Sequence, residues 1–196
     1  MKRKTKTMRK RPPWNKARQV GQKLPLNLKQ IRSIRARLKS ARRMRESALF
    51  DLAIDSSLQA VDVVGLRVRD IARGRRVLTR ATVTPRGLQR PVQFEIGNAA
   101  RDSIAAWIAQ EELRPNQYLF SSRLSASPHL SVRQYARLVA SWVKSIGLDA
   151  DAYGTESLRR TKSALVYLQT RSLLAAQLLL GHSRLSTTAR FLGVEV

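Results

Sequence analysis

Four side chains in the last third of the chain have the types and spacing for phosphate chemistry. Arg159, Arg160 and Lys162 fall on one predicted helix, and His182 follows another helix in a Leu-Gly-His string. An arginine guanidinium matches two phosphate oxygens at once, and a histidine donates or accepts a proton near neutral pH. Taken alone, these residues are more typical of a solvated basic helix face with a surface histidine at a helix end.

The spacing of three segments favours phosphate chemistry instead. Residues 181–191, Gly-His-Ser-Arg-Leu-Ser-Thr-Thr-Ala-Arg-Phe, resemble the segment that closes the catalytic domain of the tyrosine recombinases (phage integrases), in which a nucleophilic tyrosine stands nine residues after the histidine. Residues 155–161, Thr-Glu-Ser-Leu-Arg-Arg-Thr, resemble the family's His-x-x-Arg box. Residues 57–66 resemble its first-arginine box, typically Gly-Leu-Arg-x-x-Glu-x-x-x-Leu, and the Asp-Ile pair at 70–71 falls where the family's sheet begins.

The three boxes stand in the family's order, with predicted strands between the first and the second. The resemblance covers roughly residues 40 to 196, and it is nearest to compact integrase-like proteins that lack a separate core-binding domain. Tyrosine recombinases usually continue for another helix beyond the tyrosine segment. The chain ends five residues after Phe191, at Val196, which leaves open a truncation at the C-terminus.

The resemblance implies a mechanism that uses side chains alone. In this family the tyrosine hydroxyl attacks a DNA phosphodiester and forms a 3′-phosphotyrosyl link. Two arginines stabilise the charge on the non-bridging oxygens, a lysine on the sheet hairpin protonates the leaving 5′ oxygen, and two histidines, or a histidine and a tryptophan, exchange protons. The covalent link stores the bond energy, so the resemblance implies no cofactor, no metal and no small-molecule substrate.

When the family's six catalytic positions are matched to this chain residue by residue, two of them hold the family's residue type and four hold another residue. Phe191 keeps an aromatic ring at the nucleophile position but has no hydroxyl to attack phosphorus. An arginine at the lysine position keeps its proton, and losing a single charge-stabilising donor costs about 10²–10³ in rate. We therefore expect a chain that does not cleave DNA. The retained positions are Arg159 (second arginine) and His182 (later histidine), and the replaced ones hold Gln59 (first arginine), Glu156 (earlier histidine), Arg86 (hairpin lysine) and Phe191.

Another tyrosine would have to take over for the chain to be active. Tyr135 falls in a predicted amphipathic helix, where packing in the core is the expected role, and Tyr153 and Tyr167 flank the Arg159 segment. Attack requires a hydroxyl within about 3 Å of the phosphorus in the correct orientation. We therefore do not expect any of the four tyrosines, including Tyr118, to replace the missing nucleophile.

The net charge of +25 predicts a polyanionic partner, because a field of that size attracts nucleic acid. Residues 1–45 hold 18 of the 38 Lys and Arg and no acidic residue. We expect duplex DNA as the partner, together with an active recombinase or a second copy on the DNA. A disordered solubilising tail is the alternative for residues 1–25. The predicted DNA-contacting residues are Lys2, Arg3, Lys4, Lys6, Arg9, Lys10, Arg11, Arg32, Arg35, Arg160, Lys162 and Arg184.

The composition also excludes several classes of protein. No run of about 18 apolar residues is present, so no membrane span is expected. The basic N-terminus lacks the apolar region of a signal peptide, and we find neither an amphipathic nor a lipidated anchor for anionic lipid. Cysteine is absent, which excludes disulfides and thiolate metal sites and fits a reducing compartment. We expect a cytoplasmic protein at the nucleoid.

Three functional hypotheses remain open. The first is a DNA-binding member of the family without cleavage activity, which includes a plain transcriptional regulator. The second is an active, complemented or decayed recombinase, and the missing hydroxyl at Phe191 disfavours activity in this chain. The third is a basic RNA- or ribosome-associated protein whose resemblance is accidental. Preference for duplex DNA over structured RNA at matched salt discriminates the first hypothesis from the third.

The elements that must position these residues form an α+β pattern with helix dominant. After a flexible basic arm over 1–25, apolar residues at helical spacing from Leu28 to Leu38 predict an amphipathic basic helix, the start of a catalytic domain over 26–196. Alternation predicts three short antiparallel strands at 66–71, 77–83 and 91–96, with a turn at Gly74. Further helices are expected at 43–54, 60–65, 99–110, 132–146 with Ser131 as N-cap, 155–168 and 173–180, and a last one near Ser186, capped by Ser186 or Thr187.

Overall fold

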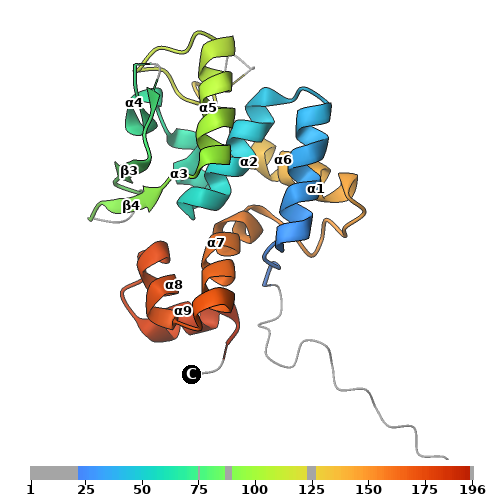
Figure 1. The fold of residues 1–196 in the computed structure, drawn as a ribbon, viewed down its shortest axis with the longest axis vertical. Helices are drawn as coiled ribbons and strands as arrows, with labels where there is room; N and C mark the ends of the chain where they lie inside the picture. Colours follow the sequence, from blue (N-terminus) through green and yellow to red (C-terminus); the bar gives the residue numbers. More distant parts are fainter. Residues whose placement is uncertain (1–21, 75, 87–89, 123–126, 195–196) are drawn as a thin grey trace, which may run out of the picture.

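The computed structural model describes residues 22–74, 76–86, 90–122 and 127–194. Helices dominate these ranges, and short strands lie at one side of the helical body (Figure 1). This arrangement confirms the predicted fold class, a mainly helical α+β fold with a small antiparallel β component. None of the described helices is long and apolar enough to cross a lipid bilayer.

The first helix, α1 (Leu28–Ser40), begins at a reciprocal cap and confirms the predicted amphipathic helix. The Asn27 carboxamide accepts a hydrogen bond from the Gln30 amide at 2.9 Å, and the Gln30 side chain accepts one from the Asn27 amide at 2.8 Å. These bonds satisfy two backbone donors that a helix start leaves open. The buried face of α1 consists of Ile31, Ile34 and Leu38.

The central helix is α2 (Met44–Ser56), which packs against α1, α3 (Ala60–Gly65), α5 (Asn98–Gln110) and α7 (Thr155–Thr170). Eight of its residues are buried, Asp51 among them, so α2 contributes apolar side chains on nearly every side. The Asp51 carboxylate accepts hydrogen bonds from Arg35 Nε at 2.6 Å and from the Ser103 hydroxyl at 2.9 Å. Burial raises the pKa of Asp51, and the Arg35 charge opposes that shift.

The prediction of a strand over 66–71 is wrong, because most of this segment is the single helical turn α4 (Val68–Ile71). The Asp70 carboxylate accepts a hydrogen bond from the Arg67 amide at 2.7 Å, which stabilises the first turn of a helix. The apolar residues of the segment, Leu66, Val68 and Ile71, are nevertheless in the core, and the helical turn brings Ile71 to the same side as Val68. Leu66 is extended, and its carbonyl accepts a hydrogen bond from the Leu119 amide at 2.8 Å, a partner that the sequence pattern did not indicate.

The described strands form two antiparallel pairs in place of the predicted three-stranded sheet. Strand β1 (Ala72–Arg73) pairs with β2 (Arg76–Val77), and Gly74, at φ +59°, stands in the turn as predicted. Strand β3 (Arg80–Val83) pairs with β4 (Val92–Glu95) in a register that sets Ala81 opposite Phe94. The predicted strand over 77–83 is therefore divided between the two pairs, and the one over 91–96 is confirmed as β4.

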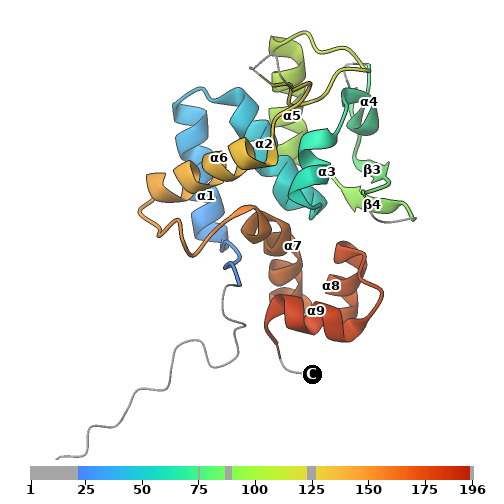
Figure 2. The same cartoon turned by 180° about the vertical axis from the view of Figure 1, so that it is seen from behind.

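Helix α6 (Val132–Ser145) confirms the predicted cap, since the Ser131 hydroxyl accepts a hydrogen bond from the Gln134 amide at 3.1 Å. Seen from behind, α6 lies across α1 and α2 (Figure 2). Its buried Trp142 packs edge-on against Phe50 of α2, with ring centroids 5.5 Å apart. The Trp142 indole donates a hydrogen bond to the Glu46 carboxylate at 2.6 Å, so the polar end of this core side chain is satisfied.

The last three helices, α7, α8 (Leu173–Leu180) and α9 (Leu185–Leu192), form a group at one end of the molecule (Figures 1 and 2). α8 packs against both of its neighbours, and α9 also contacts α7. The predicted cap of the last helix is wrong, because Arg184 occupies that position and no side chain caps it. Ser186 and Thr187 are exposed on the first turn, whereas the buried hydroxyl is that of Thr188.

Candidate functional site

Three side chains from the α7–α9 group meet around one aromatic ring, that of Phe191. The guanidinium carbon of Arg159 lies 5.3 Å from the centroid of the Phe191 ring, and that of Arg160 lies 4.6 Å from it. The His182 ring stands edge-on to the same ring, with centroids 5.3 Å apart and an interplanar angle of 88°. These four residues are called the Phe191 cluster below. The fold thus brings together three of the six positions carried over from the family, together with Arg160.

A glycine turn between α8 and α9 positions His182. Gly181 ends α8 at φ +67°, a backbone conformation that residues with a Cβ rarely adopt, and the chain reverses there. His182 Nδ1 then lies 3.1 Å from the Thr188 hydroxyl, and the Gln177 side chain donates to the His182 carbonyl at 3.0 Å. The imidazole is therefore fixed from α9 through its ring and from α8 through its backbone.

The protonation state of His182 follows from its surroundings. Burial lowers the pKa of His182 below its ordinary value of 6.5, and the positive charge of Arg159 lowers it further. The imidazole is therefore neutral at pH 7. A neutral imidazole has one N–H donor and one acceptor nitrogen, so it is able to exchange a proton with a ligand oxygen at the cluster.

Arg159 reaches from α7 to the end of α2. Its Nε donates to the Ser57 carbonyl at 3.3 Å, and its Nη1 lies 3.6 Å from Glu156 Oε2 one turn earlier on α7. The Arg159 side chain is 16% exposed and that of Glu156 is 47% exposed. Glu156 therefore supplies a negative charge to the one guanidinium that the family resemblance retains, which weakens its attraction for a phosphate.

Gln59 and Arg86 stand on neighbouring segments rather than inside the cluster. Gln59 is exposed at the N-cap of α3, two residues after the carbonyl that Arg159 contacts. The Arg86 amide donates to Asp62 Oδ1 at 2.8 Å, which ties the segment after β3 to α3, while the Arg86 side chain is exposed. Oδ2 of the buried Asp62 has no hydrogen-bond partner among the described residues.

Two residues predicted to contact phosphate have contacts within the protein. Arg160 is 5% exposed, and its Nη1 donates to the Lys23 carbonyl at 2.6 Å. Lys162 Nζ donates to the carbonyls of Asp55 at 3.0 Å and Glu95 at 3.1 Å. Both cations therefore connect chain segments that are distant in sequence, a role that the basic helix pattern did not predict.

The remaining predicted DNA contacts differ in exposure. Arg32 on α1 and Arg184 at the start of α9 are exposed, whereas Arg35 forms a 2.6 Å ion pair with the buried Asp51. Arg32 and Arg184 have the exposure that a contact with an external phosphate needs. The predicted contacts in the N-terminal arm lie outside the described residues, namely Lys2, Arg3, Lys4, Lys6, Arg9, Lys10 and Arg11.

The four tyrosines of the chain stand in different surroundings. Burial raises the pKa of the Tyr135 hydroxyl far above its ordinary range, with the Glu156 charge as a smaller cause, so it stays protonated. The Tyr153 hydroxyl accepts a hydrogen bond from Gln30 at 3.2 Å, and the Tyr118 hydroxyl accepts one from Arg67 at 3.2 Å. Tyr167 is half-buried on α7, two turns after Arg159. The predicted absence of a substitute nucleophile stays a prediction.

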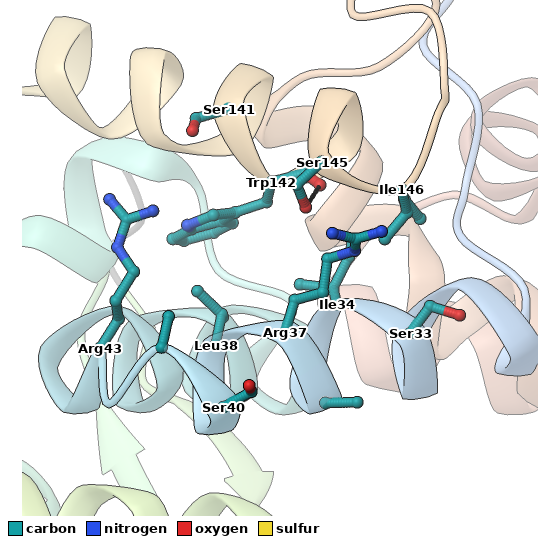
Figure 3. A pocket seen from close by; sticks show the side chains of 12 residues that line it. Ser33, Ile34, Arg37, Leu38, Ser40, Arg43, Ser141, Trp142, Ser145 and Ile146 are labelled. Carbon is teal, nitrogen blue, oxygen red and sulfur yellow. Dashed lines mark hydrogen bonds between the residues drawn. The ribbon is translucent and has the colours of Figure 1, made fainter.

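A hollow of about 790 Å³ lies between α1 and α6, apart from the Phe191 cluster (Figure 3). Trp142 forms one wall and Leu38 and Ile34 form the opposite side, with the side chains of Arg37 and Arg43 at the edges. None of the residues that line it belongs to the positions carried over from the family. Among the described residues, no group of three or more His, Asp or Glu side chains is placed to hold a metal ion.

The sequence did not single out several residues that shape the cluster. Thr188 and Ser57 contact His182 and Arg159, and Gln22 donates to the backbone carbonyls of Arg190 and Phe191 at 3.0 and 2.9 Å. Thr188 lies only six residues after His182, on the first turns of α9, so its closeness along the chain was a usable signal. Nothing in the local pattern around Gln22 indicates a contact with residues nearly 170 positions away.

Comparisons with known proteins show what the whole chain is similar to. Residues 25–195 match the model of the phage integrase family. The probable integrase/recombinase YoeC of Bacillus subtilis (strain 168) is 25% identical over 151 residues, which make up 77% of this chain and 78% of that protein. The tyrosine recombinase XerC of Thermodesulfovibrio yellowstonii is 24% identical over 159 residues, which make up 78% of this chain and 51% of that protein.

Solved structures show the same fold. The XerA recombinase superimposes with a TM-score of 0.72 at 14% identity, over 88% of this chain and 61% of that chain. The XerH recombinase bound to its difH substrate superimposes with a TM-score of 0.67 at 20% identity, over 86% of this chain and 51% of that chain. The chain thus spans about three-quarters of YoeC and between about one-half and three-fifths of XerC, XerA and XerH.

Proposed function

The chain belongs to the phage integrase family, and on that premise we propose that it binds duplex DNA in site-specific recombination without cleaving the DNA itself. It acts by occupying a recombination site or by joining an active recombinase there. The arm over residues 1–25 adds phosphate contacts to those of the domain over 26–196. In this proposal the chain is encoded by a mobile genetic element and acts in the recombination of that element.

One observation supports the proposal that the chain does not cleave DNA. Arg159, Arg160 and His182 converge on the ring of Phe191, and this ring has no hydroxyl. Cleavage requires an oxygen that forms a bond to phosphorus while the bond from phosphorus to the 5′ oxygen breaks. The family uses the hydroxyl oxygen of a tyrosine at this position, and a phenyl ring has no lone pair to supply in its place. The guanidinium groups stay protonated and have no free lone pair either. The cluster therefore supports phosphate binding without strand transfer.

The net charge and the solved relatives support duplex DNA as the partner. XerH and the Tn1549 transposon integrase were solved bound to their DNA substrates. The present chain has a net charge of +25, which favours association with a polyanion through release of counterions. The exposed Arg32 and Arg184 are the described side chains that we assign to phosphate contacts, together with Arg159 at the cluster.

The test is a search for covalent protein–DNA adducts. Nicked duplexes that tile the DNA on both sides of the gene are incubated with the full chain, with Phe191→Tyr, and with Phe191→Tyr combined with Gln59→Arg and Glu156→His. A denaturing gel reveals adducts, and a native gel reveals binding. We expect binding without an adduct from the unmodified chain. The combined variant should form adducts about 10²–10³-fold faster than Phe191→Tyr, because Gln59→Arg restores a donor that stabilises the charge on the phosphate oxygens.

The outcomes separate the hypotheses. An adduct from the unmodified chain would show that another residue attacks, and the proposal would be wrong. Tighter binding to a structured RNA than to a DNA duplex of equal length, at equal salt, would support the RNA-associated hypothesis instead. A Phe191→Trp variant, which keeps an aromatic ring and also lacks the hydroxyl, is the matched control and should form no adduct.

A further inference from the structure

Residues 22–26 cross from the start of α1 to the end of α9, and they are called the strap here. In Figures 1 and 2 this stretch lies between α1 and the α7–α9 group. The Gln22 carboxamide donates two hydrogen bonds at the end of α9, to the Arg190 carbonyl at 3.0 Å and to the Phe191 carbonyl at 2.9 Å. The strap therefore holds the helix end that bears the central ring of the Phe191 cluster.

A second contact joins the strap to the same ring. The Lys23 carbonyl accepts a hydrogen bond from Arg160 Nη1 at 2.6 Å, and the Arg160 guanidinium lies 4.6 Å from the centre of the Phe191 ring. Arg160 is 5% exposed, so this contact is shielded from water. Phe191 is thus held through its backbone by Gln22 and through its ring by Arg160, and both contacts depend on the strap.

The strap is anchored along its length. The Leu24 amide donates to the Ala152 carbonyl at 3.0 Å, and the Leu26 amide donates to the fully buried Thr161 hydroxyl at 3.0 Å. Lys23 Nζ donates to the Asp151 carbonyl at 2.6 Å. These partners lie on α7 and on the connection before it, so the position of Gln22 is set by the protein core. Residues 22–24 also precede residue 25, where the match to the family begins.

The end of α9 needs such a contact. A helix leaves its last carbonyls without partners inside the helix, and a helix of eight residues is too short to be stable by itself. Gly193 ends α9 in the left-handed conformation, and its amide already donates to the Arg190 carbonyl at 3.2 Å. The Phe191 carbonyl lies nearer the helix end and accepts from Gln22. Gln22 therefore supplies a donor where the helix lacks one.

We propose that Gln22 is a positioning residue, which holds the end of α9 so that Phe191, His182 and Arg159 keep their mutual arrangement. The proposal rests on the proposed function only in taking this cluster as the DNA-contacting site. It makes the strap a structural link between residues 1–21, the first part of the predicted arm over 1–25, and the cluster, because the chain passes directly from residue 21 into Gln22.

The experiment compares three variants of the full chain in the absence of DNA. Gln22→Glu keeps the size of the side chain, has no donor for the carbonyls, and adds a negative charge at the negative end of the helix. Gln22→Lys keeps a donor and has the favourable charge. Gln169→Glu is the matched control, since Gln169 is exposed on α7 and its side chain has no hydrogen bond among the residues that the structure describes. The readouts are backbone amide exchange and the titration of the His182 imidazole by NMR.

We expect Gln22→Glu to speed amide exchange over 185–192 about 10-fold, the effect of removing two hydrogen bonds, with α2 and α5 unchanged. The pKa of His182 should rise toward 6.5, because loosening α9 exposes the imidazole and moves it from Arg159. Gln22→Lys and Gln169→Glu should match the unmodified chain in both readouts.

Three results overturn the proposal: unchanged exchange in α9, an equal increase in all helices, or an unchanged His182 titration. An equal increase would indicate a general decrease in stability rather than positioning. DNA and cleavage play no part in these measurements, so their failure is distinct from the failure of the proposed function, which the adduct assay tests.

Discussion

At the scale of single residues, the candidate site combines retained contacts with changed chemistry. Phe191 fills the place where Arg159 and His182 converge, and it keeps the packing of a ring without a reactive oxygen. Glu156 pairs with Arg159 at 3.6 Å on the exposed side of α7. Under the proposed function, the charge balance around Arg159 and the missing hydroxyl at Phe191 decide how this cluster acts on phosphate.

Glu156 is expected to weaken DNA binding. Replacing it by Gln removes a negative charge beside Arg159, and the side chain is about half-exposed, so the gain is that of a surface ion pair. We expect Glu156→Gln to tighten binding about two- to fivefold, measured by fluorescence anisotropy on a duplex of about 30 base pairs at fixed salt. Glu112→Gln, which removes an exposed acid from another part of the surface, is the control. Equal effects of the two substitutions would mean that only net charge matters.

His182 is expected to make stability depend on pH. Burial and the Arg159 charge keep its folded pKa below the ordinary 6.5, so the unfolded chain binds a proton more readily. This contribution to stability is fully present above 6.5 and is lost as the pH falls through the folded value. Urea unfolding between about pH 5 and pH 8 should therefore show a smaller rise in stability for His182→Gln than for the unmodified chain.

The same substitution at His129, the other histidine of the chain, controls for the removal of an imidazole. A His182→Gln profile that runs parallel to that of the unmodified chain over the whole range would contradict the predicted neutral, buried imidazole.

At the scale of elements, α2 and α6 form the body against which α7 is placed. Phe50 on α2 is fully buried and packs edge-on against Trp142 of α6. The sequence predicted both helices, over 43–54 and 132–146, and the predicted cap Ser131 is present at the start of α6. The pairing of the two faces depends on their approach in space, which local periodicity does not encode.

Truncating the central ring should destabilise the whole domain. We expect Phe50→Ala to lower the free energy of unfolding by about 3–5 kcal/mol, the cost of a large cavity in a close-packed core. Leu178→Ala on α8 should change it by no more than about 0.5 kcal/mol, because that side chain is 72% exposed. Denaturant unfolding followed by circular dichroism measures both. A decrease of less than about 1 kcal/mol for Phe50→Ala would mean that the core repacks around the site.

The segment over 66–71 shows where a local pattern fails at the element scale. Its alternating residues fit a strand, but the Asp70 carboxylate closes a helical turn on the Arg67 amide at 2.7 Å. The amides of Val68 and Arg69 donate to the carbonyls of Gln117 and Pro115 at 3.0 and 2.9 Å. A capping side chain and partners about 50 residues away therefore outweighed the alternation.

At the scale of the whole molecule, charge and topology together would determine how the chain meets DNA under the proposed function. The N-terminal 45 residues contain no acid, and the strap within this segment contacts the α7–α9 group. The basic arm is therefore joined to the domain beside the Phe191 cluster. The long-range attraction of DNA should depend on the charge of the arm. The arrangement of side chains around a bound phosphate should depend on the residues of the Phe191 cluster.

DNA affinity should fall steeply with salt. Six to ten neutralised phosphates predict a decrease of about 10³–10⁵ in affinity between about 50 and 200 mM salt. Replacing the arm cations by Gln should reduce the slope of log affinity against log salt by about 0.9 for each phosphate that is no longer neutralised. Filter binding on one duplex checks both, and Lys144→Gln on α6 is the control. An affinity independent of salt would exclude the phosphate-contacting role. The replaced residues are Lys2, Arg3, Lys4, Lys6, Arg9, Lys10 and Arg11.

The sequence by itself determined the fold class, the bounds of most helices and the family. Helical spacing of apolar residues from Leu28 to Leu38, and caps such as Ser131, depend on neighbours within one or two turns, so they are legible in a linear string. The segments around residues 59, 156–159 and 182–191 were identifiable because their order and spacing along the chain match a family.

Only the tertiary structure decided what the basic side chains contact. Arg35, Arg160 and Lys162 have the same residue types as cations that bind phosphate, yet each has a partner within the protein. It also placed Gln22 at the end of α9, across 169 positions of sequence. The physical reason is that hydrogen bonds and ion pairs act over a few ångströms in space, whereas the sequence pattern reports only which residues are near along the chain.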